Sequence, residues 1–116
     1  MGTPTEASEQ LVLVKWLRRN RINFFHPPNG GKRALSEARL LKSMGVSAGV
    51  PDIIIVDPVP GYVATALELK RVSGGTVSKH QKVWLKLLKD RGWASLVARG
   101  ARDAIKQLKE LGYGLS

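Results

Sequence analysis

The chain begins with a segment of helical hydrophobic periodicity. Residues 3–20 predict a helix whose inward face includes Leu13 and Leu17, which lie one turn apart. Thr3 is expected to cap this helix, with Pro4 in its first position, because a hydroxyl suits the cap and proline needs no amide donor there.

The remaining pattern of apolar and polar residues predicts seven further elements. Strand-forming residues, helical spacing and turn residues set their approximate bounds. The expected elements are a strand at 22–26, a helix at 34–44, strands at 53–57 and 62–70, a helix at 78–91, a strand at 93–98 and a helix at 101–111. This order predicts a single α/β domain over residues 1–116, with a mixed central β-sheet flanked by helices.

The most plainly buried strand is the run 53–56, three isoleucines and a valine. Asp52 directly precedes it, and a turn at 57–61 leads into the next strand. Strand alternation places Glu68 and Lys70 on one face of that second strand. If the two strands form a hairpin, its open end brings the two carboxylates together.

Two carboxylates at one sheet edge repel each other unless a cation lies between them. Their oxygens favour Mg²⁺ or Mn²⁺, whereas the absence of cysteine and the presence of only two histidines argue against zinc. A lysine on the same face can orient an attacking water or stabilise charge on a phosphate. Asp52, Glu68 and Lys70 therefore predict metal-dependent hydrolysis of a phosphodiester.

The charge of the chain supports a polyanionic partner. Nineteen Lys and Arg against nine Asp and Glu give a net charge of +10. On so small a domain this balance indicates nucleic acid, with a solvated basic surface or an anionic membrane as alternatives.

Other features exclude several classes of protein. Without cysteine there are no disulfides, and no apolar run reaches the roughly 18–20 residues that span a membrane. The first residues are polar and lack the basic and apolar regions of a secretory signal. We therefore expect a cytoplasmic protein with no membrane partner.

The acidic motif belongs to a longer ordered set. Pro51-Asp52 followed by Glu68-Leu69-Lys70 resembles the PD-(D/E)XK nuclease superfamily, and the wider pattern is similar to its VRR-Nuc branch. The matching motifs are, in chain order, Glu6 with Gln10, Pro28-Asn29-Gly30-Gly31, Gly45 before Gly49-Val50-Pro51-Asp52, Glu68-Leu69-Lys70, and Ser78 with Gln81. They cover nearly the whole chain, which makes the set far more specific than the acidic motif alone.

This resemblance implies a restriction-endonuclease-like core. A chain with little beyond that core is similar to the stand-alone phage- or prophage-type members, which resemble Holliday-junction resolvases. The resemblance implies a homodimer that cuts branched DNA, such as Holliday junctions or flaps, with Mg²⁺ or Mn²⁺. The expected location is the cytoplasm of a bacterial cell or of a phage-infected host.

The resemblance also implies a role for each residue of the acidic motif. Asp52 and Glu68 would bind the metal, with the backbone carbonyl of Leu69 as a third ligand. Lys70 would position or activate the attacking water.

Two helical residues are expected to assist this site, and each has a structural alternative. Gln81 would orient Lys70 or a phosphate, but with Ser78 it also fits a capping box. Glu6 would complete the site from the first helix, but with Thr3 it fits a second capping box. Glu9 competes with Glu6 for that role.

Five residues are expected to contact DNA phosphates. Asn29, Lys32 and Arg33 lie in a basic, glycine-rich loop, and Lys79 and Lys82 belong to a lysine stripe on the helix at 78–91. The alternatives are a plain solvated loop and a solvated helix face.

Two other functions remain open from the sequence. One is a non-catalytic DNA-binding module that keeps the fold, and the other is a sequence-specific restriction-type endonuclease. The two histidines, His26 and His80, are expected to be structural or DNA-facing rather than catalytic.

Overall fold

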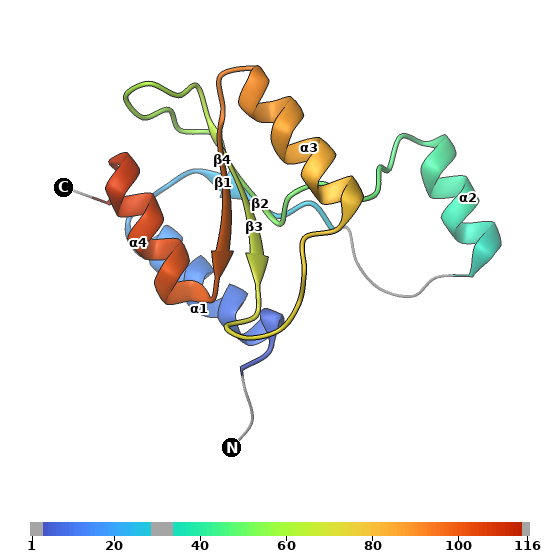
Figure 1. The fold of residues 1–116 in the computed structure, drawn as a ribbon, viewed down its shortest axis with the longest axis horizontal. Helices are drawn as coiled ribbons and strands as arrows, with labels where there is room; N and C mark the ends of the chain where they lie inside the picture. Colours follow the sequence, from blue (N-terminus) through green and yellow to red (C-terminus); the bar gives the residue numbers. More distant parts are fainter. Residues whose placement is uncertain (1–3, 29–33, 115–116) are drawn as a thin grey trace.

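The computed structural model describes residues 4–28 and 34–114. Its elements, in chain order, are α1 (Glu6–Arg19), β1 (Phe24–Phe25), α2 (Leu35–Ser43), β2 (Ile53–Ile55), β3 (Thr65–Lys70), α3 (Lys79–Asp90), β4 (Ala94–Arg99) and α4 (Ala101–Leu111). The predicted order of helices and strands is confirmed (Figure 1). None of these described helices is long and apolar enough to cross a membrane.

The four strands form one mixed sheet in the order β1-β2-β3-β4. β2 pairs antiparallel with both β1 and β3, whereas β4 pairs parallel with β3. The parallel pair requires a crossover, which α3 supplies between β3 and β4. The predicted mixed α/β architecture is therefore confirmed.

The main core lies between the sheet and the pair α1 and α4 (Figure 1). Strand alternation sends Leu67 and Leu69 of β3 into this core, where they join Leu13 and Leu17 of α1. α3 lies across the sheet from α1 and α4 (Figure 1). The side chain of Glu68 therefore lies on the α3 side, as the alternation predicts.

The start of α1 differs from the prediction. Glu6 is its first helical residue, so Pro4 precedes the helix, and Thr5 is the cap. Thr5 Oγ1 accepts a 3.0 Å hydrogen bond from the amide of Ser8, the donor three residues along. The expected cap at Thr3, which lies outside the described residues, is wrong because Thr5 offers the same hydroxyl two residues later.

The first three strands are shorter than predicted, and a tyrosine closes the hairpin where β3 begins. The stretch from 56 to 64 is a loop, within which Val59 forms a bridge with Tyr62. The buried Tyr113 hydroxyl donates to the carbonyl of Asp57 at 2.6 Å and lies 2.8 Å from Thr65 Oγ1. These contacts fix the loop end of the hairpin to the segment that follows α4.

α2 is the most exposed of the described helices, because Leu41 is half-buried and its other residues are exposed. Figure 1 shows it standing apart from the sheet and from the helices that cover it. Leu40 is 60% exposed and Met44 is 72% exposed. Gly45 follows with a φ of 102°, so the predicted glycine stop is confirmed.

Candidate active site

The predicted acidic motif comes together at the open end of the β2–β3 hairpin. Asp52 directly precedes β2, and its Oδ2 accepts a 2.7 Å hydrogen bond from the amide of Leu69 in β3. Lys70 Nζ lies 3.6 Å from Glu68 Oε2, and the two side chains share the α3 face of the sheet. The register that pairs Ile53 with Leu67 produces this arrangement, because Asp52 then lies beside the last residues of β3.

The backbone of Leu69 faces the same edge as Asp52. The carbonyl of Lys70 accepts a 2.9 Å bond from the amide of Gly100, so this residue faces β4. In a strand, the N–H and C=O of one residue point to the same side and successive residues alternate. Leu69 therefore faces the β2 side, where its amide binds Asp52 and its carbonyl lies beyond the first residue of β2.

Glu68 has an unusual environment. It is 2% exposed, and its Oε1 is buried without a hydrogen-bond partner among the described residues. The pKa of the Glu68 carboxyl is raised from 4.5 to about 8, mainly by burial and then by the nearby Asp52 carboxylate, while Lys70 opposes both. An unpaired acceptor in a buried site costs free energy, so it marks a place where a cation or a donor would stabilise the fold.

Gln81 forms the capping box that the sequence left as an alternative, and it also contacts the acidic motif, at Glu68 rather than at Lys70. Its Oε1 accepts from the amide of Ser78 at 2.7 Å, and Ser78 Oγ accepts from the amide of Gln81, which completes the capping box of α3. Its Nε2 donates to Glu68 Oε2 at 2.9 Å. The cap thus orients the amide that holds the buried carboxyl.

Gly49 allows α3 to approach the segment that leads to Asp52. Its φ is +79°, and a Cβ at this position would lie 2.6 Å from the backbone carbon of His80 and 2.7 Å from the amide nitrogen of Gln81. A side chain would displace the first turn of α3. The glycine therefore helps to keep Gln81 within reach of Glu68.

His26 also lies beside the acidic motif, which no sequence pattern indicates. Its Nδ1 is 2.6 Å from the carbonyl oxygen of Asp52. The contact follows from the pairing of β1 with β2, which sets the residue after β1 beside the residue before β2. Only the long-range pairing of these two strands could have predicted it.

The structure does not bring the glutamates of α1 to the acidic motif. Glu6 is exposed and forms no hydrogen bond or ion pair with Asp52, Glu68 or Lys70. Glu9 is half-buried, and its Oε1 would lie 2.7 Å from a Cβ on Gly100. The role of Glu6, with Glu9 as its alternative, stays a prediction.

The predicted DNA contacts fall into two groups. Asn29, Lys32 and Arg33 lie outside the described residues. Lys79 and Lys82 are exposed in the first turns of α3, on either side of Gln81. They therefore flank the end of the helix that lies nearest the acidic motif.

The donor set fits a hard divalent cation better than a soft one. Asp52 and Glu68 offer carboxylate oxygens, including Glu68 Oε1, which has no partner in residues 4–28 and 34–114, and the carbonyl of Leu69 faces the same edge. Oxygen-only donors suit Mg²⁺ and Mn²⁺. Within the described part of the chain, no three His, Cys, Asp or Glu residues form a metal-holding group, so the carbonyl is needed as a third donor.

A mixed sheet with Asp before one strand and Glu-x-Lys in the next is the arrangement of a PD-(D/E)XK nuclease-type domain. The family model for the VRR-NUC domain matches residues 5–102. The chain therefore belongs to the VRR-NUC domain family, which is of this nuclease type.

A solved structure gives the same result. It is described as a VRR_NUC domain protein and is 26% identical, with a TM-score of 0.83 over 97% of this chain and 91% of that one. The search of curated proteins finds no match.

The environment of Glu68 predicts how stability depends on pH. Between pH 4.5 and about 8 the folded protein keeps a proton on Glu68 that the unfolded chain has lost. Unfolding then releases a proton, so the free energy of unfolding of the metal-free protein falls as pH rises through this window. Denaturant titrations at several pH values, with a chelator present, measure this fall.

Glu68→Gln provides the comparison. The amide carries no charge, so the variant should lose this part of the pH dependence and be more stable than the parent above pH 8. Identical pH profiles for the two proteins would contradict a raised pKa at Glu68.

Proposed function

We propose that this protein is a metal-dependent DNA endonuclease that hydrolyses phosphodiester bonds and selects branched DNA. The observation that carries the proposal is the group of half-buried Asp52 with buried Glu68 and Lys70, in which Glu68 Oε1 has no partner among the described residues. A carboxyl kept in this state costs stability, which is typical of a functional site rather than of a structural ion pair.

Three oxygen donors would hold the ion: the carboxylates of Asp52 and Glu68 and the carbonyl of Leu69. When bound, Mg²⁺ or Mn²⁺ polarises a phosphoryl oxygen and lowers the pKa of a bound water. Gln81 positions Glu68, because its amide donates to Oε2 and leaves Oε1 for the ion.

Lys70 supplies a fixed positive charge beside these oxygens. Its side chain is buried, with the residue 7% exposed, and its amino group lies 3.6 Å from Glu68. A charge fixed in a site of low dielectric stabilises developing negative charge without reorganising solvent. We assign Lys70 to orienting the attacking water and to stabilising charge on the phosphate.

The surroundings suit a DNA strand. Lys79 and Lys82 lie in the first turns of α3 beside this site, and their exposed amino groups are proposed to contact phosphates. The net charge of +10 favours association with a polyanion.

Replacing Lys70 tests catalysis separately from binding. Lys70→Met keeps an apolar stem but removes the charge, so we expect DNA cleavage to slow by at least about 100-fold while DNA binding changes little. Cleavage of labelled DNA with Mn²⁺ and a binding titration without metal give the two quantities.

The matched control is Lys89→Met on the exposed side of α3, which should cleave at the parental rate. If Lys70→Met cut DNA as fast as this control, the proposed mechanism would be wrong. If the parent bound DNA but never cut it under any divalent metal, the non-catalytic binding module would be the better interpretation.

Selection of branched DNA is part of the same proposal and rests on the resemblance to resolvase-like nucleases. We expect four-way junctions or flaps to be cut at least about tenfold faster than a linear duplex of the same sequence. Initial rates on the three substrates at one protein concentration measure this preference. Equal rates on all three substrates would contradict selection of branched DNA. Strict dependence on one base sequence would favour a restriction-type enzyme.

We further propose that the active protein is a homodimer, which places two sites on a substrate with two strands to cut. The exposed apolar residues of α2 support this, because nine residues are too few for a stable isolated helix in water. Burying Leu40 and Met44 against a second copy would stabilise α2.

Sedimentation tests the dimer. The parent should sediment at twice its 12.7 kDa mass, and Leu40→Glu should shift it towards the monomer. Leu11→Glu is the matched control, since Leu11 is a 66% exposed leucine on α1. A monomeric parent, or equal dissociation of both variants, would contradict dimerisation through α2.

A further inference from the structure

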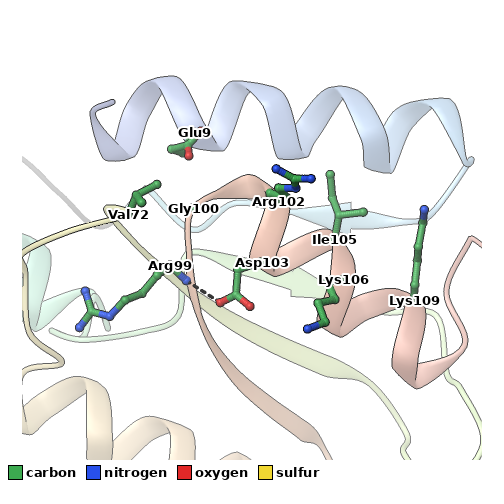
Figure 2. Close-up of a pocket in the computed structure, with 9 residues that line it drawn as sticks. All are labelled: Glu9, Val72, Arg99, Gly100, Arg102, Asp103, Ile105, Lys106 and Lys109. Atoms are coloured by element: carbon green, nitrogen blue, oxygen red, sulfur yellow. Dashed lines mark hydrogen bonds between the residues drawn. The ribbon is translucent and has the colours of Figure 1, made fainter. Parts of the chain in front are cut away.

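A second candidate binding surface is a groove of about 760 Å³ that is lined mostly by α4, with Glu9 of α1, Val72 and the end of β4. Figure 2 shows the side chains that line it. None of Asp52, Glu68 and Lys70 lines the groove, but Gly100 of its lining donates its amide to the carbonyl of Lys70, so the groove borders the site proposed for cleavage. Its size falls within the range of ligand pockets, about 300–1,000 Å³.

Three cations of α4 line this groove without being neutralised. Arg102, Lys106 and Lys109 are exposed and lie at helical spacing. The ion pairs among the described residues are Lys70 with Glu68 and Lys86 with Asp90, so none of the three has a carboxylate partner. Like charges on one helix face repel each other, which an anionic ligand would relieve.

Neither carboxylate of the groove neutralises the three cations. Asp103 forms hydrogen bonds within the protein, and Glu9 lies at the other end of the groove (Figure 2). Asp103 Oδ2 accepts from the amide of Arg99 at 2.9 Å and from Gln107 Nε2 at 3.1 Å. Glu9 lies against Gly100, at the start of α4 (Figure 2). The end of the groove beside Lys106 and Lys109 therefore has a net positive charge.

Apart from Arg99, whose guanidinium donates to the carbonyls of Gly74 and Gly75, the rest of the lining is apolar. Val72 and Ile105 contribute aliphatic surface, and Figure 2 shows Ile105 between Arg102 and Lys109 on α4. Lysine stems add further methylene groups below their charged ends. An apolar wall bordered by cations suits the sugar and phosphate groups of a nucleic-acid strand better than a small inorganic anion.

We propose that this groove binds the sugar-phosphate backbone of a DNA segment other than the one being cut. The proposal rests on the proposed function only in taking DNA as the ligand. The family match ends at Arg102, so Lys106 and Lys109 lie beyond the part of the chain that it covers. The site and the groove would then hold two arms of one branched molecule.

The test is the salt dependence of DNA binding. The groove variant replaces Arg102, Lys106 and Lys109 by Gln. The control variant replaces Lys15, Arg19 and Lys89 by Gln, so both proteins lose three positive charges. Fluorescence anisotropy with a labelled four-way junction, in chelator so that no metal supports cleavage, gives affinity at several salt concentrations.

We expect the groove variant to lower the slope of log affinity against log salt by about two to three relative to the control. Its affinity at low salt should fall by at least about tenfold, whereas Glu9→Gln should tighten binding. Equal slopes and affinities for the two triple variants would overturn the proposal. So would a groove variant that binds the junction normally but loses binding to vesicles of anionic lipid.

Two further measurements separate this proposal from the proposed function. The groove variant should unfold at the same denaturant midpoint as the control, and it should cut a short linear duplex at the parental rate. A parent that cuts no DNA, combined with the expected difference in slopes, would overturn the nuclease and leave the groove standing. If the parent cut DNA but the two triple variants had equal slopes, the nuclease would stand and the groove proposal would be overturned.

Discussion

The buried carboxyl of Glu68 is the constraint on which the rest of the site depends. β3 holds it on the α3 face with one oxygen that has no partner in the described part of the chain, where burial and Asp52 both oppose its ionisation. The surrounding contacts limit this cost: Gln81 donates to the other oxygen, and Lys70 lies 3.6 Å away. Gly49 in turn lets α3 come close enough for Gln81 to make its contact.

The sequence predicted the parts of this arrangement that follow from local geometry. Alternation along one strand puts Glu68 and Lys70 on one face, and a hairpin brings Asp52 to the same edge. The order of elements followed from periodicity and turn residues for the same reason, since each depends on neighbours in the chain. The capping box of α3 was also visible, because its two residues are three positions apart.

Features that depend on long-range packing could not be predicted in this way. His26 meets Asp52 only because β1 pairs with β2, and the double role of Gln81 requires α3 to pack on β3. The groove requires α1 and α4 to lie side by side. The predicted cap of α1 was wrong for a different reason. Two threonines lie two residues apart, and cap propensity alone does not choose between them.

Tyr113 has a consequence for how the chain acquires its structure during synthesis. Its hydroxyl bonds the Asp57 carbonyl, 56 residues earlier, and lies beside Thr65, 48 residues earlier. β3 also needs β4 as its parallel neighbour, and such non-local pairing forms late because the intervening loop must be closed first. The loop end of the hairpin therefore gains these two contacts only after residue 113 has emerged from the ribosome, whereas β3 gains its parallel neighbour as soon as β4 is available.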